Sequence, residues 1–302
     1  MPAASSSAAA LALDILSEAY ERLQPETAHL QPDEADALTG RDLRRVQGPT
    51  RGTRVPHLAV SHCCSQSSLR PGIDTLVHRY GEVRFSAFEP LLTLLREHSG
   101  GTADGTADCF IDIGSGTGKL VLFAAALGLQ SVGIELVHSR HVVGLRVQQA
   151  LLEEDHGDEK TAPLAAAIQG RIGGASLRCA DALAPSEADS LANGTLFLCN
   201  NAVWPSRLTA EVVTRGLTPE RAPRLSVLAT LKEVPEEALE AASLVLARAS
   251  CVSVTWDPIG WPLFVYCRRC LVQSHDSSQR LPVIDESFHI GIESRDGIAM
   301  YG

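Results

Sequence analysis

The stretch CFIDIGSGTGKLVLFAAALGLQSVGIEL, residues 109–136, decides the fold. It opens with a short apolar run typical of a buried strand. It then passes an acid and three glycines in the pattern G-x-G-x-G, and continues as an apolar run up to Gly128. A second strand-like run, SVGIEL (131–136), follows. This order predicts a nucleotide-type binding site, because glycines let a ligand approach the backbone and the helix N-terminus offers unpaired N–H groups.

Strand-like and helix-like runs keep alternating after residue 136. SRHVVGLRVQQALLEE (139–154) has apolar residues at helical spacing. Strand-like runs lie within ASLRCADAL (175–183), GTLFLCNN (194–201) and APRLSVLATL (222–231), and CVSVTWDPIGWPLFVYCRR (251–269) holds a pair joined by a short turn. The alternation predicts a parallel sheet with helices on both faces, and the last pair predicts an antiparallel hairpin at one edge. We therefore expect an α/β, Rossmann-like fold with a seven-stranded, mostly parallel sheet.

The chain before residue 109 is less regular. LALDILSEAYERL (11–23) has apolar residues at helical spacing, and Tyr20 lies on that apolar side. Residues 24–70 contain four prolines and no sustained period. Ser86 followed by Glu89 is a capping-box pattern, which predicts a helix over about residues 87–98.

These patterns suggest three parts of the chain. We expect an N-terminal helical and irregular arm over residues 1–70, a main domain over 71–275 and a C-terminal extension over 276–302. We also expect the arm to be dispensable for binding at the glycine loop, though not necessarily for substrate binding, so that a chain starting near Gly72 still folds.

Composition and charge exclude several classes of protein. The chain has 302 residues and a net charge of −10 at pH 7, which argues against a large surface for nucleic-acid phosphates. No apolar run approaches the ~20 residues needed to span a bilayer. The N-terminal residues also lack the basic region of a signal peptide. We therefore expect no strong intrinsic nucleic-acid binding and no membrane segment.

The cysteines do not predict a metal site. Cys267 and Cys270 form a single C-x-x-C, and no second pair follows at zinc spacing. SHCC (61–64) could join them, but unrelated thiols are the simpler interpretation. Four cysteines lie within strand-like runs and are expected to be small buried residues in a reducing compartment: Cys109, Cys179, Cys199 and Cys251.

The glycine loop differs from the common phosphate-binding loops. A P-loop has four residues between its glycines and a hydroxyl residue after the lysine, whereas Leu120 follows Lys119 here. A dinucleotide loop is G-x-G-x-x-G. Asp112 stands just ahead of the glycines, where it would repel a pyrophosphate and attract a cationic amino-acid moiety. S-adenosyl-L-methionine carries an ammonium and a sulfonium and has no phosphate, so it is the expected cofactor.

Two further acids follow the next two strands. Glu135 stands at the tip of the second strand, where a carboxylate can accept both ribose hydroxyls. Asp181 follows the third strand and is placed to reach the adenine amino group. The simpler alternatives are a solvated strand end for Glu135 and a helix cap for Asp181. An acid after each of three strands resembles a class I methyltransferase. The candidate cofactor residues in this part of the chain are Asp112, Gly114, Gly116, Gly118, Lys119, Glu135 and Asp181.

A narrower resemblance rests on two more stretches, YGEVRF (80–85) and LFLCNNAVWP (196–205). Together with IDIGSGTGKLVLFAAA (111–126), and with the hairpin near the C-terminus, they resemble the disruptor-of-telomeric-silencing (Dot-one) family of non-SET histone lysine methyltransferases. The resemblance covers roughly residues 70–270. It implies a protein-lysine N-methyltransferase that acts on a core lysine of histone H3 or the nucleosome, in the nucleus.

The resemblance also implies roles for individual residues. Tyr80 and Glu82 would belong to a loop that folds over the methionine end of the cofactor. Asn200 would contact the cofactor near the transferring methyl group, and Trp204 would help to wall the lysine channel. Tyr80, Asn200 and Trp204 are thus the candidate catalytic residues. The alternatives are a packing tyrosine at 80, a strand-end turn at Asn200 and Asn201, and a core aromatic at 204.

The sequence also departs from that family. Ala202, Val203 and Trp204 stand where the family has phenylalanines, Lys119 stands where it often has glutamine, and no lysine-rich tail is present. An enzyme acting on a small molecule or a non-histone protein, expected in the cytoplasm, is therefore the alternative. A cofactor-binding module without catalysis is a third possibility, against which the intact acids and Asn200 count.

Overall fold

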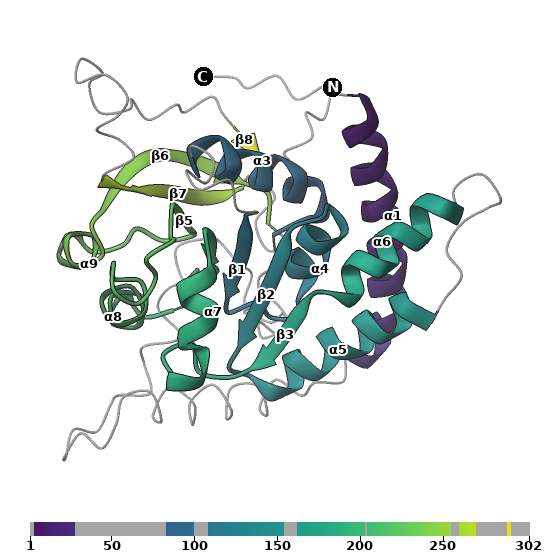
Figure 1. The fold of residues 1–302 in the computed structure, drawn as a ribbon, viewed down its shortest axis with the longest axis horizontal. Helices are drawn as coiled ribbons and strands as arrows, with labels where there is room; N and C mark the ends of the chain where they lie inside the picture. The colour runs from purple at the N-terminus through teal and green to yellow at the C-terminus, as the bar shows by residue number, and fades with distance from the viewer. Residues whose placement is uncertain are drawn as a thin grey trace, which may run out of the picture.

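The computed structural model describes residues 3–27, 83–99, 108–153, 162–202, 204–254, 260–269 and 289–290. In these residues a twisted sheet runs through the molecule and helices cover both of its faces (Figure 1). Tyr80, Gly81 and Glu82 lie outside the described residues, as do His62, Cys63, Cys64, Val203 and Cys270.

The sheet follows the strand order β3-β2-β1-β4-β5-β7-β6-β8. β7 (Trp261–Arg268) is antiparallel to both of its neighbours, β5 and β6 (Leu244–Val252). The order reverses between β1 and β4, and open parallel sheets bind ligands beyond the carboxyl ends of their strands at such a point. The parallel strands are β1 (Cys109–Ile113), β2 (Gln130–Glu135), β3 (Ser176–Cys179), β4 (Leu196–Cys199) and β5 (Val227–Thr230).

This topology confirms the predicted α/β, Rossmann-like fold, with an antiparallel pair of strands at the C-terminal side. A short additional strand, β8 (His289–Ile290), lies in the predicted C-terminal extension and pairs in parallel with β6. β6 begins at Leu244, well before the strand-like run that the sequence revealed. Its register shifts between Leu246 and Arg248, and this irregularity breaks the simple alternation by which a strand is recognised.

Several helices match the prediction and several were missed. The short turn η1 (Phe85–Ala87) leads into α3 (Phe88–Ser99), and α4 (Lys119–Ala126) and α5 (His138–Glu153) lie close to their predicted positions. The missed helix α6 (Ala162–Gly173) is alanine-rich, and α7 (Ala188–Asn193) and α9 (Glu236–Ala241) are too short for a clear apolar period. The remaining elements are η2 (Pro185–Glu187) and α8 (Ser206–Gly216).

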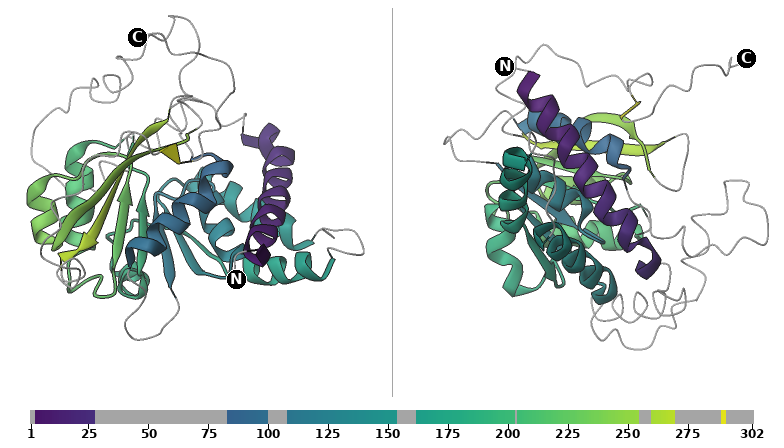
Figure 2. Two further views of the ribbon diagram at one scale, coloured as in Figure 1. Left: turned by 90° about the horizontal axis from the view of Figure 1, so that it is seen from above. Right: turned by 90° about the vertical axis from the view of Figure 1, so that its right-hand side faces the viewer.

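Two hydrophobic clusters fill the two faces of the sheet. In β1, Phe110 belongs to one cluster and Ile111 to the other, because successive side chains of a strand point to opposite faces. One cluster is covered by α1 (Ala3–Thr27) together with α3, α4, α5 and α6, and the other by α7, α8 and α9. The two views in Figure 2 show these two helical layers and the sheet between them.

The N-terminal helix is part of the main domain. α1 packs against α4, α5 and α6, as the right-hand view of Figure 2 shows. Its predicted apolar side contributes Ile15, Leu16, Ala19 and Tyr20 to the hydrophobic core. The packing of α1 counts against the prediction that the whole N-terminal arm is dispensable, because removal of α1 would expose one side of the core.

The structure corrects two of the cysteine predictions. Cys109 and Cys199 are buried as expected, whereas Cys179 is exposed, because β3 lies at the edge of the sheet, and Cys251 is only partly buried. The Cys267 thiol is buried and lies 3.5 Å from the carbonyl oxygen of His98, and burial raises its pKa to about 11. Within the described ranges, no cluster of histidine, cysteine or acidic residues could hold a metal ion. In those same ranges, no helix has both the length and the apolarity to cross a bilayer.

Candidate functional site

The glycine loop connects β1 to α4 in a conformation that requires glycine. Gly114, Gly116 and Gly118 have φ of 78°, 57° and 80°, a region that other residues rarely adopt. A Cβ on Gly114 would lie 2.9 Å from the Trp204 ring, and one on Gly118 would lie 2.8 Å from the side chain of Leu177. The loop is therefore packed closely from both sides, and its backbone is fixed next to the end of β1.

Asp112 is the least satisfied polar group of the site. The side chain is only 4% exposed, and its Oδ1 atom has no hydrogen-bond partner. Burial, with a further contribution from the charge of Glu135, raises the pKa of Asp112 to about 8. The carboxyl group therefore stays largely protonated at neutral pH unless a cation approaches it.

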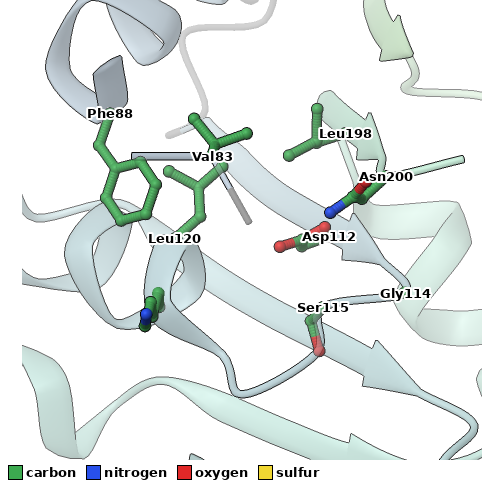
Figure 3. A pocket seen from close by; sticks show the side chains of 9 residues that line it. Val83, Phe88, Asp112, Gly114, Ser115, Leu120, Leu198 and Asn200 are labelled. Atoms are coloured by element: carbon green, nitrogen blue, oxygen red, sulfur yellow. The ribbon is translucent and has the colours of Figure 1, made fainter. Parts of the chain in front are cut away.

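A pocket opens beside Asp112, at the topological switch point between β1 and β4. It is lined by Asp112, Gly114 and Ser115 from β1 and the glycine loop, by Lys119 from the start of α4, and by Asn200 from the end of β4. In Figure 3 the carboxylate of Asp112 and the carboxamide of Asn200 point toward one another across this space. The apolar part of the wall consists of Val83, Phe88, Leu120 and Leu198. Four of the predicted site residues thus meet at one pocket.

Glu135 lies next to this pocket and contacts the glycine loop directly. Its Oε2 accepts a hydrogen bond from the backbone N–H of Gly116 at 2.7 Å, and its Oε1 accepts one from Val137 at 2.8 Å. An Arg140 guanidinium nitrogen lies 4.0 Å from the same Oε1 atom. Glu135 is only 4% exposed, so the alternative of a solvated strand end is wrong.

Asp181 follows β3 at the neighbouring strand end. Cys179 pairs with Glu135 in register, which places Asp181 close to the same edge of the sheet. Its Oδ1 accepts a hydrogen bond from the N–H of Leu183 at 2.9 Å, and its carbonyl accepts one from Ala184 at 2.8 Å. Asp181 therefore stabilises a local turn and is not a helix cap, because the cap of the next helical turn, η2, is Ala184. Its predicted contact with adenine stays a prediction.

The two asparagines after β4 have different roles. Asn200 lines the pocket, whereas Asn201 is fully buried behind it. The Asn201 carboxamide oxygen accepts hydrogen bonds from the N–H groups of Leu231 and Lys232, both at 2.8 Å. Its nitrogen donates to Thr209 at 3.2 Å and to the carbonyl of Lys232 at 3.3 Å. Asn201 thus joins the end of β4 to the end of β5 and holds Asn200 at the pocket.

Trp204 lies against the glycine loop. Its ring is in contact with Gly114, its backbone N–H donates to the carbonyl of Asn201, and its own carbonyl accepts from the Lys232 ammonium at 2.9 Å. The side chain is partly buried against the second hydrophobic cluster. The predicted role of Trp204 in an acceptor channel stays a prediction, and Trp204 is not among the residues that line the pocket.

The segment before α3 reaches the pocket from the opposite direction. Val83 lines the pocket and pairs with Val254 in an antiparallel bridge. Arg84 donates its backbone N–H to Ser253 and its side-chain Nε to the carbonyl of Val254, each at 2.9 Å. Tyr80 and Glu82 precede this anchor in the sequence, so their predicted role as a cofactor loop stays a prediction.

Sequence reasoning missed one polar contact of the glycine loop. The Tyr20 hydroxyl of α1 donates a hydrogen bond to the carbonyl of Thr117 at 2.8 Å. The available signal was a tyrosine on the apolar side of a predicted helix, because a buried tyrosine hydroxyl usually finds a partner. Lys119, predicted to contact the cofactor, places its ammonium 4.9 Å from the Tyr20 ring centroid.

No protein-family model and no curated protein matches the sequence. Among solved structures, magnesium protoporphyrin IX methyltransferase from Synechocystis PCC 6803 is similar, at 12% identity over 61% of this chain and 80% of that chain, with a TM-score of 0.38. Ribosomal protein L11 methylase from Lactobacillus delbrueckii subsp. bulgaricus is 13% identical over 63% and 81% of the two chains, with a TM-score of 0.37. An RNA methyltransferase from Salinibacter ruber, solved with S-adenosyl-L-homocysteine, is 16% identical over 65% of this chain and 97% of that chain, with a TM-score of 0.34. At these identities the likeness concerns the fold alone.

Proposed function

We propose that this protein is an S-adenosyl-L-methionine-dependent methyltransferase. One observation carries the proposal: the buried carboxyl group of Asp112 has an oxygen without a partner, beside a glycine loop at the carboxyl end of β1. A buried polar atom in this state costs about 1–3 kcal/mol, and a ligand that donates a hydrogen bond to it would recover that free energy.

The expected donor is a cation on an amino-acid moiety. A phosphate at this point would face the carboxyl groups of Asp112 and Glu135, which disfavour an anion. The ammonium of a methionine moiety would instead donate to Asp112 and favour its ionised form. The three glycines allow the positive-φ backbone that holds the loop beside Asp112.

Glu135 fits the nucleoside part of the same ligand. An ionised carboxylate has about four acceptor positions, and the N–H groups of Gly116 and Val137 occupy two of them. The remaining positions would accept the ribose hydroxyls, while Asp181 at the next strand end would serve the adenine.

The bound cofactor would supply an electrophilic methyl group, and this chain would contribute mainly positioning. Asn200 would orient the methionine end of the cofactor through its carboxamide without adding charge. Trp204, in contact with Gly114, would offer an aromatic wall to a cationic acceptor. Transfer of a methyl group depends strongly on such alignment of the reacting atoms.

A protein lysine, with histone H3 as the leading candidate, is the acceptor that the sequence stretches at 80–85 and 196–205 favour. Val83, which directly follows Tyr80–Glu82 in the sequence, lines the pocket. A small molecule or another protein is the alternative acceptor. A histone substrate implies that the protein works in the nucleus. A small-molecule acceptor or another protein acceptor implies that it works in the cytoplasm.

Calorimetric titration with S-adenosyl-L-homocysteine tests the cofactor assignment. We expect Asp112→Ala and Glu135→Ala each to weaken binding by about 1–3 kcal/mol, the loss of a charge-assisted hydrogen bond. Glu240→Ala, on the exposed surface of α9, is the matched control and should bind as the wild type does. Wild-type affinity in both site variants would refute the assignment.

A methyl-transfer screen then identifies the acceptor. Purified protein is incubated with methyl-labelled cofactor and with nucleosomes, free histones or a small-molecule extract. Label on histone H3 would support the lysine proposal, whereas label only in the extract would favour the small-molecule alternative. Cofactor binding without transfer to any of the three would favour the non-catalytic module.

A further inference from the structure

The glycine loop has a support that comes from outside the sheet. The hydroxyl of Tyr20, which belongs to α1, donates a hydrogen bond to the carbonyl of Thr117 at 2.8 Å. Both residues are buried, with 6% of each exposed. The contact joins residues 97 positions apart, so it forms only when α1 is docked on the domain.

A second helix, α5, also approaches the carbonyl of Thr117. A Cβ on Gly144 of α5 would lie 2.7 Å from the Thr117 oxygen, which means that α5 approaches the loop closely because residue 144 is glycine. Thr117 is therefore held between α1 and α5, directly between the two glycines, Gly116 and Gly118, that require positive φ.

Aromatic contacts connect α1 to the pocket as well. The Lys119 ammonium lies 4.9 Å from the Tyr20 ring centroid and 5.4 Å from that of Phe85. The Tyr20 and Phe85 rings are 5.8 Å apart, and Phe85 and Phe88 are 5.1 Å apart. Phe88 lines the pocket, so a continuous set of side chains runs from α1 to the wall of the site.

We propose that α1 is part of the cofactor-binding machinery and that Tyr20 is a positioning residue, which holds the glycine loop in its binding conformation through the Thr117 carbonyl. The proposal rests on the proposed function for its ligand. A loop with three glycines has many accessible conformations, and ordering it on binding costs free energy. A hydrogen bond that orders the loop in advance reduces this cost, so its loss should weaken binding more than it destabilises the fold.

Tyr20→Phe separates the hydrogen bond from the packing, because the ring and its contact with Lys119 stay. We expect the Kd for S-adenosyl-L-homocysteine to rise about 3- to 10-fold, as expected for one hydrogen bond. Hydrogen exchange in residues 114–122 should become faster, while exchange in β4 and β5 should not change.

Tyr266→Phe is the matched control. Tyr266 is also buried, and its hydroxyl accepts a hydrogen bond from the N–H of Val234, on the face of the sheet opposite α1. We expect it to lower the melting temperature at least as much as Tyr20→Phe and to leave the Kd unchanged. Equal losses of affinity in the two variants would mean a global effect and would overturn the proposal.

A second pair of variants tests the α5 side of the loop. Gly144→Ala should weaken cofactor binding and speed exchange in residues 114–122, because the new Cβ would meet the Thr117 carbonyl. Gly170→Ala of α6, where a Cβ would meet nothing within 4 Å, should bind as the wild type does. If the wild type does not bind S-adenosyl-L-homocysteine, the proposed function fails. The exchange measurement still decides the role of Tyr20, and unchanged exchange in Tyr20→Phe overturns it.

Discussion

The carboxyl ends of β1 and β4 lie side by side in the sheet, yet their buried polar side chains are satisfied to different degrees. Beyond β4, Asn201 uses both ends of its carboxamide in hydrogen bonds to the backbone and to Thr209. At β1, an oxygen of Asp112 is buried without a partner. Buried polar groups in native proteins are nearly always paired, so a complete set of bonds indicates a structural role and an incomplete set indicates a missing ligand.

The largest expected effect is the loss of stability when Asn201, the residue with a complete set of hydrogen bonds, is replaced. Asn201→Ala should destabilise the fold by on the order of 2–4 kcal/mol, because it leaves the N–H groups of Leu231 and Lys232 without their acceptor. Urea denaturation measures this loss, with Asn193→Ala on the exposed surface of α7 as the control. A loss of less than about 0.5 kcal/mol, the range of ordinary surface substitutions, would contradict a structural role.

Asn200 offers the sharpest contrast with its neighbour. Asn200→Ala should lower turnover about 100-fold, because misplacement of reacting groups by ~1 Å has effects of this size. The melting temperature should change little. The measurement is activity per folded molecule, on whichever acceptor the screen identifies. Wild-type activity combined with a lower melting temperature would make Asn200 a structural strand-end residue like Asn201.

Asp112→Asn tests the group whose hydrogen bonds are incomplete. It should stabilise the protein while weakening cofactor binding. The folded-state pKa of Asp112 is raised to about 8, from an ordinary value near 4. Between these two values the folded state keeps a proton that the unfolded state has lost. Stability should therefore fall as the pH rises from about 4 to about 8.

The asparagine variant cannot ionise, so it should lack this part of the pH dependence. At pH 8 we expect it to be more stable than the wild type by about 1–3 kcal/mol, the usual cost of a strained buried polar group. Parallel melting curves for both proteins over the range from pH 4 to 8 measure the difference. Identical pH profiles would show that Asp112 is not under electrostatic strain.

Trp204→Ala should have the smallest of these effects. It removes an aromatic wall that contributes about 0.5–2 kcal/mol to a lysine-like cation, so the KM for the acceptor should rise while kcat stays near the wild-type value. Trp204→Phe retains an aromatic face and should restore most of the affinity. A change in melting temperature with no change in KM would leave Trp204 as a packing residue only.

The fold was largely predictable because its signals are local. The G-x-G-x-G loop, the apolar strands and the apolar runs of α3, α4 and α5 all lie in short stretches of sequence. Of the missed helices, α6 is alanine-rich and α7 and α9 are short, so their stability depends on packing that no local pattern reveals. The helix α8 did carry a local signal, because its buried residues Thr209, Val212 and Val213 recur at helical spacing.

The candidate site was predicted in its residues but not in its contacts. Asp112 and Asn200 meet in one pocket because β1 and β4 are adjacent, which follows from the predicted sheet. The roles of Asn201 and Tyr20 could not be predicted, because both depend on partners that are distant in sequence, at residues 231–232 and 117. The supporting role of α1 likewise appears only once the helix is docked.

Proton release on cofactor binding is the measurement that tests the central claim most directly. At pH 7 the wild type should release close to one proton on binding S-adenosyl-L-homocysteine, because a carboxyl group with a pKa of about 8 ionises when it accepts the ligand's ammonium. Calorimetry in two buffers with different ionisation enthalpies measures this number, and the release should disappear in Asp112→Asn. Binding of equal affinity and equal proton release in the two proteins would contradict the account, because Asp112 would then not hold the cofactor.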